Sequence, residues 1–218
     1  MHLYLIRHGQ SYVNLADWKP ASPTEWDASL TPLGQRQAAA LAKWLPTAVP
    51  HIDALYASTM KRAQETAVPL SQTYNIPITP DDRLRELGNN RADHSPYPRE
   101  ALPVQFVGVA ESRSPFVPVM RDAADSETFT HFRVRVGLFV DEILQRPSTD
   151  VVLVVCHGGV INAVFDFVFN VGVFRSCDIW NLNTAVTHFE YDTAVGHQSW
   201  KVQFQGRTEH LNERPESH

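Results

Sequence analysis

Two histidines in this chain each stand directly after a short apolar run and directly before a glycine. His8 follows Leu-Tyr-Leu-Ile-Arg at residues 3–7, and His157 follows Val-Val-Leu-Val-Val-Cys at residues 151–156. Runs of this length and composition predict buried β-strands. Because the carboxyl ends of neighbouring parallel strands lie at one edge of a sheet, we expect the two imidazoles to meet there. A single histidine in such a place is usually structural, but the repeated arrangement predicts a reaction centre.

Two arginines are placed to complement these histidines. Arg7 directly precedes His8, and Arg62 falls in the first turn of a helix predicted to follow a strand at residues 52–57. A phosphomonoester carries nearly two negative charges at neutral pH, so a pocket that transfers it needs fixed cations. A guanidinium contacts phosphate oxygens bidentately, and each charge-assisted bond contributes ~1.5 to 3 kcal/mol. The alternatives are a surface pair that caps a strand for Arg7 and His8, and a solvated helix charge for Arg62.

Four separated segments carry motifs in a fixed order along the chain. They are Arg-His-Gly-Gln-Ser at 7–11, Leu-Thr-Pro-Leu-Gly-Gln-Arg-Gln-Ala at 30–38, Ser-Thr-Met-Lys-Arg-Ala-Gln-Glu-Thr at 58–66 and Cys-His-Gly-Gly-Val-Ile at 156–161. Together with Asn14, these motifs resemble the histidine phosphatase superfamily, the phosphoglycerate-mutase-like enzymes, in its phosphatase branch. The resemblance covers roughly residues 1–90 and 127–211.

The resemblance implies that His8 is transiently phosphorylated, which requires a neutral attacking nitrogen. His157 is then expected to stabilise the charge that spreads over the phosphoryl oxygens in the transition state. The groups that the resemblance assigns to phosphate binding are Arg7, Asn14, Arg62, His157 and Gly158.

The resemblance also implies that Glu86, in Leu-Arg-Glu, is the acid that protonates the leaving oxygen and later takes a proton from water. The chain departs from the family here, because Gly-Asn-Asn-Arg-Ala-Asp at residues 88–93 replaces the Gly-x-Trp-Glu-Gly of many family phosphatases. The alternative for Glu86 is a surface carboxylate paired with Arg83 or Arg85. The next candidate acids are Asp93 and Glu100.

We expect an α/β fold, a three-layer sandwich with a mostly parallel central sheet flanked by helices, plus an inserted lid-like segment. Thr31 and Pro32 predict the start of a helix at about 32–46, and Ser58 or Thr59 can cap the next helix. The remaining predicted elements are a short edge strand at 76–78, helices at about 127–145 and 160–169, and a closing antiparallel pair at 183–189 and 200–204.

One domain is expected to span residues 1–211, with an insertion at about 88–126 and a polar tail at 212–218. Prolines and aromatic residues in the insertion favour a packed cover with a short helix over a disordered linker. Four arginines in the insertion offer contacts to a second anionic group: Arg91, Arg99, Arg113 and Arg121.

The composition limits the partners and the compartment. A net charge of -5 opposes a nucleic-acid or membrane partner, because such binding needs a broad basic face. No apolar run approaches ~18 residues, and no signal-peptide pattern opens the chain. Cys156 and Cys177 form no disulfide framework, so we expect free thiols in a reducing cytoplasm. The ten histidines show no metal-ligand spacing, and neither a metal nor another cofactor is expected.

Three functions remain open. The favoured one is a metal-independent phosphatase whose partner is a small phosphorylated metabolite, or a phosphate or sulfate anion in its place. The others are a phosphoglycerate-type mutase and a non-catalytic phosphate-binding or interaction domain. Hydrolysis is favoured because the glycolytic mutases of the family carry a Phe-x-Gly-Trp loop that residues 15–27 lack. Specificity is expected in residues 15–29 and 88–126, and the exposed edge of the closing pair allows a homodimer.

Overall fold

The structure, a computed structural model, describes residues 1–19, 27–98, 115–120, 123–175, 177–193 and 199–211. Its described strands form one six-stranded sheet in the order β3-β2-β4-β1-β5-β6. The four parallel strands are β1 (His2–Arg7), β2 (Ala54–Ser58), β3 (Ile78–Asp81) and β4 (Val151–Cys156). β5 (Val186–Asp192) and β6 (Ser199–Arg207) close the sheet in antiparallel fashion. The predicted mostly parallel sheet is confirmed, with β3 at its edge.

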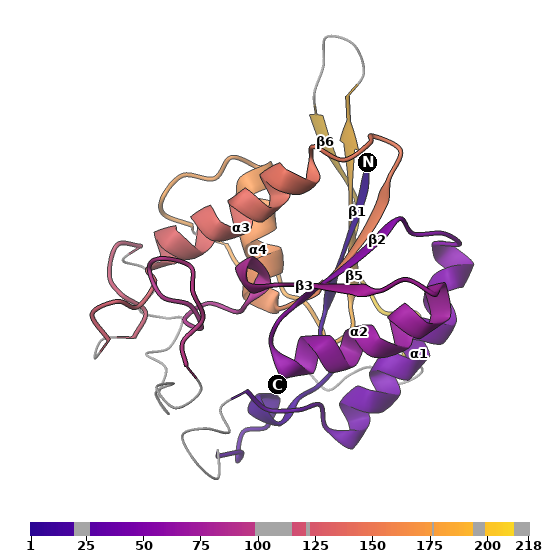
Figure 1. Ribbon diagram of the computed structural model, residues 1–218, viewed down its shortest axis with the longest axis horizontal. Helices are drawn as coiled ribbons and strands as arrows, with labels where there is room; N and C mark the ends of the chain where they lie inside the picture. The colour runs from indigo at the N-terminus through magenta and orange to yellow at the C-terminus, as the bar shows by residue number, and fades with distance from the viewer. Residues whose placement is uncertain (20–26, 99–114, 121–122, 176, 194–198, 212–218) are drawn as a thin grey trace.

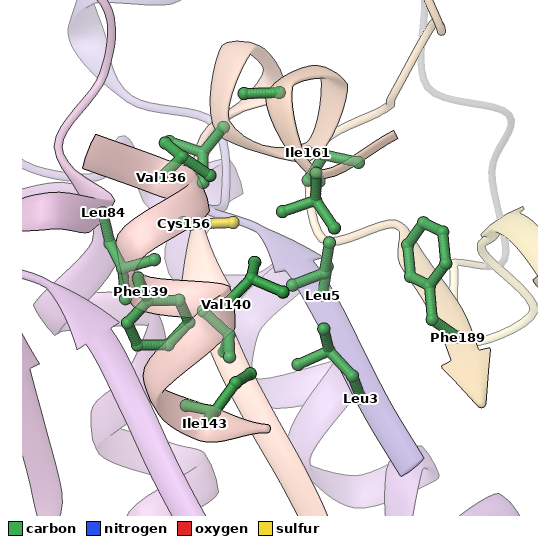
Figure 2. Packing of buried hydrophobic residues seen from close by; sticks show 14 of the residues in the cluster. Leu3, Leu5, Leu84, Val136, Phe139, Val140, Ile143, Cys156, Ile161 and Phe189 are labelled. Carbon is green, nitrogen blue, oxygen red and sulfur yellow. The ribbon is translucent and has the colours of Figure 1, made fainter. Parts of the chain in front are cut away.

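Helices cover both faces of the sheet and complete the three layers (Figure 1). α1 (Pro32–Ala48) and α2 (Lys61–Tyr74) lie on one face, and α3 (Phe129–Ile143) and α4 (Gly158–Val168) lie on the other. Each face has its own apolar core, because apolar side chains alternate along β1 and fill both sides of β4. Figure 2 shows α3 directing Val136, Phe139 and Val140 onto Leu5 and Cys156 of the sheet.

The predicted N-cap residue is confirmed for α1 but not for α2. Thr31 caps α1 as predicted, its hydroxyl accepting the Gly34 N–H at 3.1 Å. The predicted cap of α2 is wrong, because Met60 occupies the N-cap position without a side-chain hydrogen bond. The Ser58 hydroxyl instead accepts the Met60 N–H at 3.2 Å, and it also contacts the ring of His157.

The register of the central strands sets the position of the two histidines. Arg7 of β1 pairs with Cys156 of β4, so His8 and His157 leave the sheet side by side. The His8 N–H donates to the Cys156 carbonyl at 2.9 Å and fixes this exit. The predicted convergence of the two strand ends is therefore confirmed.

The described part of the 88–126 insertion consists of turns and isolated bridges. Single bridges join Asn90 to Pro96 and Arg91 to Ser126, and Tyr97 and Met120 form a small apolar cluster. No helix occurs in its described residues, which leave out 99–114 and 121–122. Arg91 pairs with Asp125 at 3.0 Å. The other three arginines of the insertion lie outside the described residues. The 212–218 tail also lies outside them.

Candidate active site

His8 is held as a neutral imidazole with one defined proton. Its Nδ1 lies 2.7 Å from the Gly9 carbonyl oxygen, which can only accept, so Nδ1 carries the hydrogen. The Nε2 lone pair then accepts from Arg62 Nε at 3.1 Å. Burial, followed by the charges of Arg62 and Arg7, lowers the pKa of His8 well below its ordinary value, against a smaller raising effect of the Gly9 carbonyl. The chain thus holds a buried, uncharged imidazole beside two cations.

Arg62 reaches His8 because it lies in the first turn of α2, directly after β2. Its side chain is only 7% exposed, and burial lowers its pKa, which the nearby charges of Asp27 and Glu86 partly restore. Asp27 Oδ1 lies 3.7 Å from Arg62 Nη1, and its carboxylate also accepts the Lys61 N–H at 2.9 and 3.1 Å. The alternative of a solvated helix charge is excluded for Arg62.

Arg7 and His157 bring buried hydrogen-bonding atoms without partners. Arg7 Nη1 donates to the Asn181 carbonyl, but Arg7 Nε and His157 Nδ1 have no hydrogen-bond partner among the described residues. Arg7 Nε lies beside the start of α4, 3.9 Å from where a Cβ of Gly158 would stand. Unpaired polar atoms at such depth are costly. A cation and a helix N-terminus together suit an anion, whose oxygens would satisfy such donors.

The two histidine rings lie together, with centroids 5.1 Å apart and planes at 60°. His157 Nε2 lies 2.8 Å from the Ser58 hydroxyl, which orients the ring. Burial, followed by the Arg62 charge, lowers the pKa of His157 well below its ordinary value. With both rings neutral, each has one N–H donor and one acceptor nitrogen at neutral pH.

Glu86 lies at the N-terminus of α4, next to His157. Its Oε2 accepts the Gly159 N–H at 3.2 Å, and its Oε1 accepts the N–H of Leu87 at 2.9 Å. A Cβ at Gly159 would stand 2.2 Å from Glu86 Oε1, so glycine at this position lets the carboxyl lie where it does. The alternative partners of Glu86 bind elsewhere: Arg83 pairs with Asp81 and Glu142, and Arg85 donates to Thr59 and Asn89.

Asn14 and Gly9 have local roles in the turn after β1. Asn14 Oδ1 accepts from the Ser11 N–H at 3.0 Å and from the Ser11 hydroxyl at 3.1 Å. Gly9 packs closely against the backbone of α1. A Cβ at Gly9 would lie 2.7 Å from the Gly34 carbonyl oxygen. Glycine at position 9 therefore serves the packing of the turn against α1.

Comparison with known proteins agrees with this geometry. The sequence model of the histidine phosphatase superfamily (branch 1) matches residues 3–203. The chain belongs to this superfamily. Among relatives, phosphoserine phosphatase 1 of Hydrogenobacter thermophilus is 26% identical over 201 residues, covering 86% of each chain. "Probable phosphoglycerate mutase GpmB" of Enterobacter sp. is 24% identical over 220 residues, covering 97% of this chain and 95% of the relative.

A solved structure extends the comparison to three dimensions. Bacillus stearothermophilus YhfR superimposes on this histidine phosphatase superfamily member with a TM-score of 0.71 and 27% identity. The superposition covers 96% of this chain and 98% of that structure. The superposition over nearly the whole chain agrees with the predicted α/β fold.

Several side-chain contacts that hold the site of this superfamily member in place were not predicted from the sequence. Asp27 contacts Arg62, Ser58 contacts His157, and the Thr66 hydroxyl accepts the Gly9 N–H at 3.0 Å. The loop before β5 also holds the first motif, because Asn183 Nδ2 donates to the His8 carbonyl at 3.0 Å. Only Ser58 and Thr66 carried a signal, as parts of the Ser-x-x-x-Arg-Ala-x-x-Thr motif.

Within residues that the structure describes, no three His, Cys, Asp or Glu side chains are grouped so that they could hold a metal ion. Among the described helices, none is both long enough and apolar enough to cross a membrane.

Proposed function

We propose that this chain hydrolyses small phosphomonoesters through a phosphohistidine at His8, without a metal ion. The observation that carries the proposal is the hydrogen bonding of His8. Its Nδ1–H donates to the Gly9 carbonyl, so the Nε2 lone pair faces Arg62 and is free of a proton. A neutral, oriented imidazole beside fixed cations is the arrangement that in-line attack on phosphorus requires.

In the first half-reaction, His8 Nε2 attacks phosphorus and the bond from phosphorus to the ester oxygen breaks. Arg62 and Arg7 hold the phosphoryl oxygens, and Arg62 exchanges its bond to Nε2 for bonds to the phosphate. His157, the Gly158 N–H and the Asn14 amide add donors. Glu86, protonated, gives its proton to the leaving alkoxide, which departs as an alcohol.

In the second half-reaction, water attacks the phosphohistidine in line. Glu86, now a carboxylate, takes the proton of the attacking water, the N–P bond breaks and inorganic phosphate leaves. His8 returns to the neutral form with its hydrogen on Nδ1. The reaction consumes one water and yields one alcohol and one phosphate, so protons and charge balance.

Phosphoserine is the first substrate class to test, because the relative from Hydrogenobacter thermophilus is a phosphoserine phosphatase. The relative named as a probable phosphoglycerate mutase makes phosphoglycerate mutase activity the second candidate function. Hydrolysis is preferred because residues 15–27 lack the Phe-x-Gly-Trp loop of the glycolytic mutases. We also expect a cytoplasmic protein, and the edge strand β6 allows a homodimer.

The test is phosphate release from a panel of monoesters, with and without chelator, beside a mutase assay. We expect release from several monoesters, phosphoserine among them, that a chelator leaves unchanged. The mutase assay supplies 3-phosphoglycerate with a trace of the 2,3-bisphosphate. Efficient conversion to 2-phosphoglycerate with little free phosphate would replace the hydrolase proposal with the mutase one.

A further inference from the structure

The proposed proton donor stands on irregular backbone. Residues Asp82–Leu84 form the short 3-10 helix η3, and the chain then turns, with the Asn89 N–H donating to the Glu86 carbonyl at 3.1 Å. Gly88 completes this turn at a φ of 80°, in the left-handed region. A catalytic group misplaced by ~1 Å loses up to ~10²-fold in rate, so such a segment needs support from its neighbours.

A fully buried ion pair lies directly behind this turn. Arg135 of α3 and Glu127, two residues before α3, both have side chains that are 0% exposed. Arg135 Nε donates to Glu127 Oε2 at 2.8 Å, and Arg135 Nη2 donates to Glu127 Oε1 at 2.9 Å. This bidentate geometry fixes both side chains relative to each other.

The same two side chains hold the backbone on both sides of Glu86. Arg135 Nη1 donates to the Arg83 carbonyl at 2.7 Å, and Arg135 Nη2 donates to the Glu86 carbonyl at 3.2 Å. Glu127 Oε1 accepts the Gly88 N–H at 2.8 Å. Three hydrogen bonds from one ion pair therefore bracket the residue that carries the carboxyl.

The pair is also linked to the other support of that carboxyl. The Arg135 guanidinium lies 4.7 Å from the centre of the Phe132 ring. The tip of that ring lies 3.4 Å from the Cβ position of Gly159, whose N–H binds Glu86. A buried ion pair is often no more stabilising than well-packed apolar residues. Its hydrogen bonds to the 83–88 backbone are what apolar residues could not supply.

We propose that Arg135 and Glu127 are positioning residues that fix the Glu86 carboxyl relative to the phosphoryl group on His8. The inference rests on the proposed function, in which Glu86 is the proton donor. Loosening the pair should harm the proton-transfer step more than phosphate binding. Esters with poor leaving groups should therefore suffer most.

The test compares phosphoserine, whose alkoxide needs protonation, with para-nitrophenyl phosphate, whose leaving group does not. The readout is the ratio of kcat/KM for the aryl ester to kcat/KM for phosphoserine. Glu86→Gln should raise this ratio by about 100-fold, the scale of general-acid catalysis. Arg135→Lys keeps the charge but loses the fork that reaches both carbonyls, and should raise the ratio by about tenfold.

The matched control is Val140→Ala, on the same helix and facing the sheet core (Figure 2). It should lower the unfolding temperature and leave the ratio unchanged. If Arg135→Lys fails to fold, the double variant Arg135→Met/Glu127→Met is assayed in its place, because two apolar side chains can fill the space of the buried ion pair. A raised ratio in that folded variant supports positioning.

The outcomes separate this inference from the function it rests on. An unchanged ratio in the Arg135 variants, with a raised ratio in Glu86→Gln, would overturn the positioning role alone. An unchanged ratio in Glu86→Gln would overturn both the acid assignment and this inference. A wild-type chain that releases no phosphate from either ester would overturn the proposed function itself.

Discussion

Arg62 Nε lies 3.1 Å from His8 Nε2, the atom proposed to attack phosphorus. The guanidinium therefore occupies the nucleophile's lone pair in the structure described here. It can do so without protonating His8, because an arginine keeps its proton at any physiological pH. An arriving phosphoryl group must take over this hydrogen bond before the lone pair can attack.

Removal of Arg62 should weaken both anion binding and catalysis. Arg62→Ala should lower kcat/KM by about 10²-fold or more, since a charge-assisted bond is worth ~1.5 to 3 kcal/mol and two are lost. Arg62→Lys keeps the charge without the planar fork, so its activity should fall between those of Ala and the wild type. Calorimetric binding of vanadate or phosphate to the three proteins checks the cause. Wild-type affinity in Arg62→Ala would place the anion elsewhere.

Substitution of Gly159 should displace the Glu86 carboxyl. The Cβ of Gly159→Ala would stand 2.2 Å from Glu86 Oε1, so the carboxyl must move. Alanine favours a helix over glycine by ~1 kcal/mol, so a loss of activity would not reflect helix propensity. We expect at least a tenfold loss of kcat/KM on phosphoserine and a smaller loss on para-nitrophenyl phosphate. Gly172→Ala is the control, because nothing lies within 4 Å of its Cβ position.

The buried histidines should make folding stability depend on pH. Burial lowers the pKa of His8 and His157 well below 6.5, so the folded chain keeps them neutral where the unfolded chain protonates them. The unfolded state then binds more protons, and this part of the stability is lost as pH falls below about 6.5. Between pH 7.5 and 5.5, each histidine contributes up to about 1.4 kcal/mol of that loss.

Urea unfolding at the two pH values checks this prediction. The double variant His8→Asn/His157→Asn keeps every carboxylate, so their contribution cancels in the comparison. Its loss of unfolding free energy between pH 7.5 and 5.5 should be smaller than that of the wild type by up to about 3 kcal/mol. Equal losses in both proteins would mean that neither histidine stays neutral in the folded chain.

Elements with a strong local pattern were predictable from the sequence. The β4 strand at 151–156 was predicted with the bounds that the structure has, since its apolar run is continuous and ends directly before His157 and Gly158. The convergence of His8 with His157 followed from strand topology, because parallel neighbours end at one edge. Glu86 was chosen from a motif, and the structure brings it to the start of α4.

What escaped prediction depends on contacts between distant segments. Asp27 meets Arg62 across 35 residues, and Arg135 meets the Arg83 carbonyl across 52 residues. Local sequence around Arg135 predicts only an amphipathic helix, in which a fully buried arginine breaks the pattern. A hydroxyl before a helix favours a capping role, which is why the sequence predicts Ser58 or Thr59 as the cap of α2, whereas Ser58 is buried beside His157 and contacts that ring.

The most direct measurement of the central claim is rapid quenching of the enzyme during turnover of ³²P-labelled phosphoserine. The account predicts a label on His8 that survives alkali and is lost in acid, as a phosphohistidine would be. His8→Ala should carry no label and release no phosphate, although it should fold, because its partner Arg62 retains Asp27. Near-normal phosphate release by His8→Ala, or a label found on another residue, would contradict the account.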